Sequence, residues 1–154
     1  MSQCLIKKFR NEMQRNVKKY GCSVVGIQGG GLSYVYSVGI GKSFGAPEVI
    51  VFALSAEMSH FVVNEYMARV KEGEQFQHRQ LAGGFLRDFE CLFIEVHARY
   101  FEKYMAWCED FYGGGDFRAL QMIIPTTEGL WPWENNRSAK TQPILGKCEF
   151  SKLI

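Results

Sequence analysis

The fold is decided by residues 48–72, EVIVFALSAEMSHFVVNEYMARVKE, which place an apolar run directly before an amphipathic one. Glu48 to Leu54 is apolar on both faces apart from its first residue, as in a central strand. Ser55 is a good N-cap for a helix over 56–72, whose apolar residues cover a broad arc. This stretch therefore predicts a buried strand followed by a helix that packs on the sheet.

The segment before this stretch reads as a helix and a hairpin. Apolar residues recur at intervals of four and three over 5–20, which indicates one face of a helix, and Gly21 is its expected C-cap. Cys22 to Ile27 and Ser33 to Gly39 have the composition and alternation of strands. We expect a hairpin with a loop of four or five residues around the three glycines at 29–31.

The segment after it continues the same alternation of strands and helices. We predict strands over Asp88 to Val96 and Arg118 to Ile124, with an amphipathic helix over Tyr100 to Tyr112 between them. Leu130 to Glu134 is expected as an edge strand, because Pro132 cannot occupy a central one. The predicted class is α+β, a mostly antiparallel sheet of about five to seven strands with about three packed helices.

Length and composition favour one globular domain over residues 1–154. The apolar fraction is 47% and the charged fraction 22%, so a disordered chain or a coiled coil is not expected. Within the domain, 1–21 is a basic N-terminal helix and 135–154 is a polar, loosely patterned C-terminal tail.

The positive charge is concentrated in the first helix. Residues 1–21 hold six basic residues against one acid, a balance of +5, whereas the rest of the chain has twelve against fifteen, a balance of −3. Nucleic acid is a possible partner for this helix but not the favoured one, because a non-specific binder usually has a wider basic field. No membrane partner is expected, since the longest apolar run, Val49 to Leu54, is too short to span a bilayer.

The five cysteines are not spaced as metal ligands or as a disulfide framework. No two lie closer than seventeen positions, and no CxxC pair occurs. Lys7 and Lys8 follow only two apolar residues, which excludes a secretory signal peptide. We expect a cytoplasmic protein with reduced, mostly buried thiols, no bound metal and no cofactor.

Several short stretches, taken together and in order, resemble the bacterial family known as domain of unknown function 4262. They are Tyr36-Ser37-Val38-Gly39, Phe44-Gly45-x-Pro47-Glu48, Phe111-Tyr112-Gly113, Asp116-Phe117, Leu120-Gln121, Gly129-x-x-Pro132-Trp133 and Gln142-Pro143. The resemblance covers roughly residues 33–146. It implies a compact single-domain bacterial protein and brings no activity with it.

A catalytic interpretation depends on the outer side of helix 56–72. Glu57 and His60 are three positions apart there, so His60 could act as a general base beside a carboxylate. A solvated helix face with an exposed pair explains the same spacing. The sequence supplies no nucleophile to complete a triad.

A binding interpretation depends on four other side chains. Trp131 and Trp133 flank a proline, and aromatic rings on a rigid support make good contact surfaces or cover the end of a core. Gln121 is polar in the middle of a strand, so it either ties down a neighbouring loop or contacts a ligand. Tyr36, in the first of the resembling stretches, completes the candidate binding residues.

We favour a non-catalytic module that binds an unknown protein or small molecule. The alternative is a small hydrolase or transferase with a His/carboxylate site in a cleft. Whether the protein is an enzyme stays open at this point, because sites assemble in space and not in sequence.

Overall fold

A six-stranded sheet lies at the centre of the computed structural model, which describes residues 2–147. The strand order is β1-β2-β3-β6-β5-β4, and every neighbouring pair is antiparallel except β3 and β6, which run parallel. The strands are β1 (Ser23–Gly29), β2 (Leu32–Val38), β3 (Glu48–Phe52), β4 (Gln80–Ala82), β5 (Cys91–Glu95) and β6 (Ala119–Ile123). The predicted α+β class with a mostly antiparallel sheet is confirmed.

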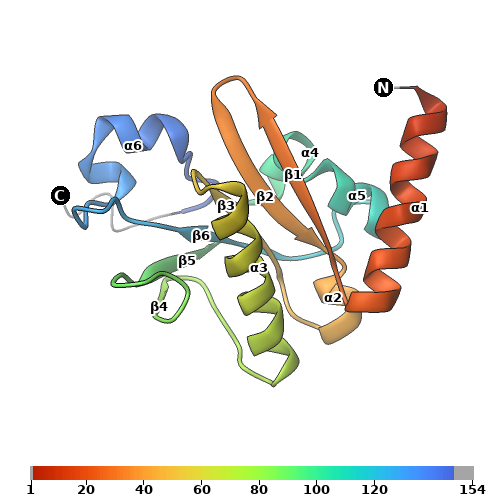
Figure 1. Ribbon diagram of the computed structural model, residues 1–154, viewed down its shortest axis with the longest axis horizontal. Coiled ribbons are helices and arrows are strands. Elements are labelled where there is room, and N and C mark those ends of the chain that lie inside the picture. The colour runs from red at the N-terminus through yellow and green to blue at the C-terminus, as the bar shows by residue number, and fades with distance from the viewer. Residues whose placement is uncertain (1, 148–154) are drawn as a thin grey trace.

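Helices cover both faces of this sheet (Figure 1). They are α1 (Gln3–Tyr20), α2 (Ile40–Phe44), α3 (Ala56–Lys71), α4 (Phe101–Tyr104), α5 (Ala106–Tyr112) and α6 (Asn136–Thr141). In Figure 1, α3 crosses in front of the sheet, α4 and α5 lie behind the β1–β2 hairpin, and α1 and α6 lie at opposite ends of the molecule.

Strand β3 is buried on both of its faces, as its apolar run predicts. Val49 and Val51 belong to the core cluster under α3, whereas Ile50 and Phe52 belong to the cluster under α4 and α5. All four side chains are 0% exposed. Ser55 caps α3 by accepting a hydrogen bond from Met58 N at 3.2 Å. The central strand and its helix are therefore confirmed.

The hairpin between β1 and β2 is tighter than expected. Gly29 pairs with Leu32, so the loop has two residues instead of four or five. Gly30 and Gly31 have φ values of +60° and +81°. Positive φ at both central positions is what a type I′ turn requires, and glycine adopts it without steric cost.

Two other predicted elements differ in the structure. The helix expected over 100–112 is interrupted at Met105, whose φ of −131° and ψ of 44° end α4 before α5 begins. The edge strand expected over 130–134 is wrong, since Pro132–Glu134 forms a 3₁₀ turn. Pro132 suits the first position of such a turn because the missing N–H has no partner there, and Glu134 N donates back to Trp131 O at 2.9 Å.

The two ends of the chain pack only in part as predicted. On α1, Met13 and Val17 are buried, but Leu5 and Tyr20 of the same expected apolar face are 55% and 59% exposed. The loosely patterned tail contains α6 and a buried Leu145, while residues 148–154 lie outside the described part.

Three of the four cysteines in the described part are buried. Cys22, Cys91 and Cys108 lie in the core, Cys4 is exposed, and all four are free thiols. Cys148 lies outside the described residues. Burial raises the pKa of Cys22 and of Cys91 to about 12, so both thiols stay protonated at neutral pH.

No helix between residues 2 and 147 is long and apolar enough to cross a membrane. Over the same residues, no cluster of three or more His, Cys, Asp or Glu side chains is placed to hold a metal ion.

Candidate ligand-binding groove

The first residue of β3, Glu48, is a fully buried carboxylate with five hydrogen-bond donors around it. Oε1 accepts from Ser37 Oγ at 2.7 Å and from Ile40 N at 3.2 Å. Oε2 accepts from Gly39 N at 3.0 Å, from Gly41 N at 3.1 Å and from the Tyr112 hydroxyl. We call these six residues the Glu48 network. Its donors satisfy both oxygens of a side chain that is 0% exposed.

The backbone between β2 and α2 is shaped for this carboxylate. Gly39 has a φ of +104°, and a Cβ at this position would lie 2.6 Å from Val17 side-chain carbons, so only glycine fits. The left-handed residue turns three successive amide groups, those of residues 39–41, toward one acceptor. Successive backbone N–H groups arranged in this way make an anion-binding concavity.

Burial is the dominant influence on the protons of this network. It raises the pKa of Glu48 above the usual 4.5, against the opposing effect of the donated hydrogen bonds. Burial and the neighbouring Glu48 also raise the pKa of Tyr112 far above its usual value. The Tyr112 hydroxyl therefore keeps its proton at neutral pH and donates a hydrogen bond to Glu48.

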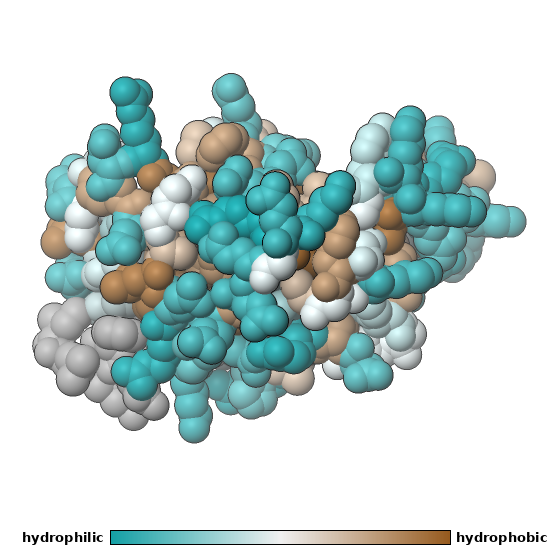
Figure 2. Space-filling view, turned by 90° about the horizontal axis from the view of Figure 1, so that it is seen from below, coloured by the Kyte–Doolittle hydropathy of each residue, from teal (hydrophilic) through white to brown (hydrophobic). Residues whose placement is uncertain are grey.

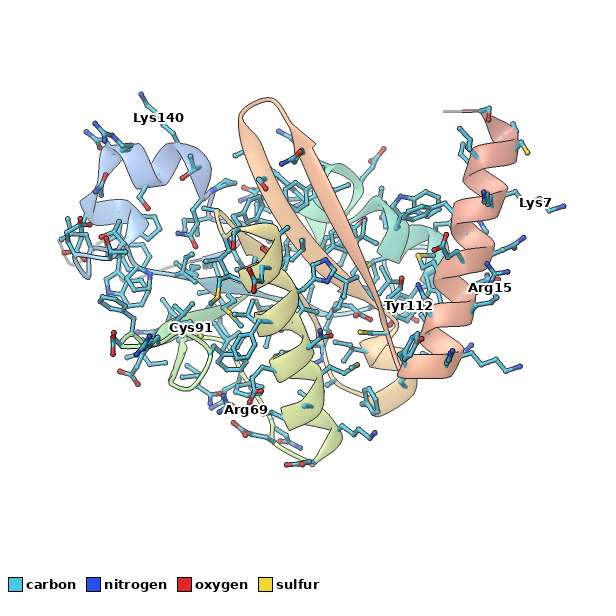
Figure 3. All side chains as sticks on the ribbon, in the orientation of Figure 1. Lys7, Arg15, Arg69, Cys91, Tyr112 and Lys140 are labelled. Carbon is cyan, nitrogen blue, oxygen red and sulfur yellow. The ribbon has the colours of Figure 1, made fainter. Side chains whose placement is uncertain are left out.

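A groove of about 1160 Å³ lies beside the network, and Tyr112 belongs to both. Its walls come from the second half of α1, from α2 and the residues that follow it, and from the segment that joins α5 to β6. We call it the α1–α2 groove. Figure 3 labels Tyr112 close to the C-terminal half of α1, far from Lys140 at the opposite end of the molecule. Seen from below in Figure 2, the α1 side at the right is covered mainly by hydrophilic side chains.

In the part of the chain that the structure describes, three cations and one acid line the α1–α2 groove. Lys18, Lys42 and Arg118 come from three different segments, and Asp116 is the acid. Arg118 binds Glu95 through one carboxylate oxygen, at 2.6 and 3.1 Å. Within residues 2–147, neither lysine has a carboxylate oxygen within 4 Å. The lining residues therefore carry a net charge of +2.

The wall opposite α2 is aromatic. Phe117 stacks on Phe101 and on Tyr112, with ring centroids 4.1 and 5.3 Å apart. Phe111 meets Tyr112 edge-on, at 5.0 Å, and Lys42 Nζ lies 5.7 Å from the Phe111 ring centre. These ring contacts hold Phe117 in place in the lining of the groove.

Four of the stretches that carry the family resemblance meet here, namely 36–39, 44–48, 111–113 and 116–117. The sequence model of the family described as Domain of unknown function (DUF4262) matches residues 16–138 of the chain. The chain belongs to the DUF4262 family. No curated protein and no solved structure matches it.

The residues of this DUF4262 protein that the sequence singled out lie elsewhere. Glu57 and His60 are exposed on α3. Tyr36 is buried, and its hydroxyl accepts a hydrogen bond from Trp107 N at 3.1 Å. Among the described residues, the lining of the α1–α2 groove includes neither these three nor Gln121.

Gln121 holds the C-terminal segment on the sheet. Its Nε2 donates to Pro143 O at 2.7 Å, and its Oε1 accepts from Leu145 N at 2.9 Å. Both polar atoms of the side chain, which is 0% exposed, are thus used within the chain. Of the two roles that the sequence left open, the structure shows the tie to a neighbouring loop.

Trp131 and Trp133 are brought together by the 3₁₀ turn. Their rings stack with centroids 5.6 Å apart and an interplanar angle of 11°. Both are half-buried against Leu92, Ile94 and Ile123 of the sheet. The pair covers the β5–β6 part of the core and also leaves ring surface exposed.

A second cavity, of about 720 Å³, lies where β3 and β6 end. Ala53, with a φ of +66°, and Ile124 are part of its lining. Gln142, which is 2% exposed, accepts from Ile124 N at 2.8 Å and donates to Ile124 O at 2.9 Å. At this end of the β3–β6 pair, a neutral side-chain amide therefore satisfies the backbone N–H and C=O of Ile124.

Sequence reasoning missed Glu48 and Tyr112. The signal was present, because Glu48 is the one polar residue at the head of an apolar strand and both residues lie in resembling stretches. A carboxylate in an otherwise buried strand must have donors, and Ser37 and the glycines at 39 and 41 are the ones that the nearby sequence offers.

Proposed function

We propose that this DUF4262 protein is a non-catalytic binding module whose ligand occupies the α1–α2 groove. The observation that carries the proposal is the position of the groove beside the Glu48 network, where four family-resembling stretches meet. The geometry of the site supports this function, since membership of a family of unknown function supplies none.

The groove is built as a preformed site. Glu48 accepts hydrogen bonds from backbone N–H groups at the start of α2 and from the Tyr112 hydroxyl at the end of α5. The walls that α2 and α5 contribute are therefore held by the same buried carboxyl group. On the third side, Val17 of α1 packs against Gly39. A rigid, mainly apolar concavity with a few placed polar groups is the usual form of a small-molecule site.

A groove-filling variant tests the proposal. Ser43 is exposed on α2 and lines the groove, so Ser43→Trp fills it without touching the core. The matched control is Asn64→Trp, an equally exposed helical position on α3. A thermal-shift screen with a mixed set of anionic, neutral and cationic small molecules is run on all three proteins. We expect stabilising compounds that Ser43→Trp no longer binds and Asn64→Trp still binds. Compounds that stabilise all three equally would place the site elsewhere.

The stacked Trp131–Trp133 pair is a second candidate surface, for a protein partner. Exposed tryptophan on a rigid support is typical of binding hot spots. Trp133→Ala should then weaken capture of that partner by about 2 kcal/mol while the protein stays folded. Loss of the fold instead assigns Trp133 to the core.

The catalytic alternative keeps His60 as the proton-transfer group beside Glu57. Both side chains are exposed on α3, outside the groove lining. A folded His60→Ala protein that has lost an activity of the wild type would favour it. We also infer a reducing, cytoplasmic location, which is supported by three buried free thiols in the described part of the chain.

A further inference from the structure

We infer that the α1–α2 groove takes an organic anion with an apolar body, that is, a carboxylate attached to an aryl or alkyl group. This inference rests on the proposed function and names the chemical class of its ligand. Charge, apolar lining and the state of the buried polar groups each point to that class.

The charges around the groove favour an anion. Lys18 and Lys42 approach it from α1 and α2 without a carboxylate partner among the described residues. Arg118 spends two nitrogens, Nε and Nη2, on a single oxygen of Glu95. Within residues 2–147, its Nη1 has no hydrogen-bond partner, so the guanidinium keeps donors for a ligand. Among the described residues, Asp116 is the one acid of the lining.

The apolar part of the lining favours a ligand with a hydrophobic body. Val17, Pro47, Phe111 and Phe117 line the same groove as the cations. Phe117 is held in place by stacking with Phe101 and Tyr112. Contact of these side chains with an aryl or alkyl group removes apolar surface from water, which favours binding of such a group.

The polar groups beneath the groove do not favour a cation. Glu48 is the buried carboxylate beside the groove, and its two oxygens already accept five hydrogen bonds. The Tyr112 hydroxyl donates to Glu48 and accepts from Lys42 N at 3.4 Å. A cationic ligand would therefore meet three positive side chains against the single charge of Asp116, and would find Glu48 and Tyr112 already hydrogen-bonded.

Four related probes test the ligand class by isothermal titration calorimetry at neutral pH. 2-Naphthoate has both the charge and the apolar body, 2-naphthamide lacks the charge, acetate lacks the body, and 2-naphthylmethylammonium reverses the charge. We expect 2-naphthoate to bind at least about tenfold more tightly than each of the other three. Its affinity should fall as salt is added, because the attraction is screened.

The matched variants are Lys42→Glu in the groove and Lys140→Glu on α6, at the opposite end of the molecule (Figure 3). Lys42→Glu should weaken 2-naphthoate by about fivefold or more and leave 2-naphthamide unchanged. Lys140→Glu should change neither. Circular dichroism checks that both variants are folded.

Three results overturn the inference. They are equal binding of 2-naphthoate and 2-naphthamide, preference for the ammonium probe, and no detectable binding of 2-naphthoate. The proposed function is judged separately by the Ser43→Trp screen. Neutral or cationic hits that this variant blocks would keep the groove as the site and remove only its anion preference.

Discussion

The two ends of the parallel pair β3–β6 are closed in different ways. At the amino ends, where Glu48 and Ala119 are paired, a buried carboxylate gathers five donors beside a groove with a cationic rim. At the carboxyl ends, the neutral amide of Gln142 binds both backbone groups of Ile124 beside a smaller cavity.

The difference shows that the amino end of the pair, with Glu48, requires more hydrogen-bond partners than the carboxyl end, with Gln142. A buried charge has to be surrounded by donors from several segments, because each missing donor leaves a costly ion in the core. The neutral amide of Gln142 needs one partner residue, and its removal costs less in the free energy of unfolding. In parallel sheets, ligands usually bind beyond the carboxyl ends of the strands. In this mixed sheet, four family-resembling stretches gather at the amino ends instead.

Removal of the carboxylate should have the largest effect. Glu48→Ala leaves three backbone N–H groups and two hydroxyls without their acceptor in the core. We expect a loss of about 4 kcal/mol in the free energy of unfolding, measured by urea denaturation. The control is Glu95→Ala, an exposed carboxylate paired with Arg118, which should cost no more than about 1 kcal/mol. Equal losses in the two variants would contradict the central role of Glu48.

Removal of the amide at the other end should cost less. Gln142→Ala leaves Ile124 N and Ile124 O unpaired in a buried position. We expect about 3 kcal/mol in the same urea experiment, whereas the exposed Gln28→Ala should change stability by less than about 0.5 kcal/mol. If Gln142→Ala destabilises the protein more than Glu48→Ala, the contrast between the two ends is reversed.

A single donor of the network can be removed without loss of its ring. Tyr112→Phe keeps the stack on Phe117 and deletes the hydroxyl that binds Glu48. A hydrogen bond to a charged group contributes about 2 kcal/mol, so a loss of that size is expected in the free energy of unfolding. Tyr20→Phe, at a 59% exposed position, serves as the control and should be neutral. If Tyr112→Phe left the free energy of unfolding unchanged, the hydrogen bond from Tyr112 to Glu48 would have no role in stability.

The pH dependence at Glu48 is the smallest expected effect. Because burial raises the pKa of Glu48 above 4.5, the folded protein holds this proton at pH values where the unfolded chain has lost it. The contribution of Glu48 to the free energy of unfolding is fully present below its pKa in the unfolded chain. This contribution decreases as the pH rises through its pKa in the folded protein. The stability of the wild type minus that of Glu48→Gln should therefore shrink as the pH rises from 4.5, followed by urea midpoints. A difference that grows with pH would show that the donors lower the pKa instead.

Local patterns were enough to predict most elements of the fold. The apolar run of β3 and the Ser55 cap of α3 depend on neighbours in sequence, and both are confirmed. The 3₁₀ turn at Pro132 was mistaken for a strand, because five residues with two tryptophans have the composition of either. The break at Met105 has no signal in the local pattern.

The candidate site could not be predicted in the same way. Tyr112 lies 64 positions from Glu48, so only the folded chain shows that one completes the other. Lys18, Lys42 and Arg118 are ordinary surface cations in the sequence, and they become a rim only when α1, α2 and the start of β6 meet. His60 and Trp133 attract attention by residue type, which says nothing about position in space.

The position of the donors around Glu48 also has a consequence for how the chain folds. Ser37 is 11 positions from Glu48, so pairing of β2 with β3 can bring them together early, but Tyr112 arrives only when α5 docks. A half-assembled chain would have to bury the carboxylate before its last donor is in place, or leave it in water with β3 unpacked. Both states are costly, so the network disfavours partial assembly and couples the pairing of β2 and β3 to the docking of α5 in one cooperative transition.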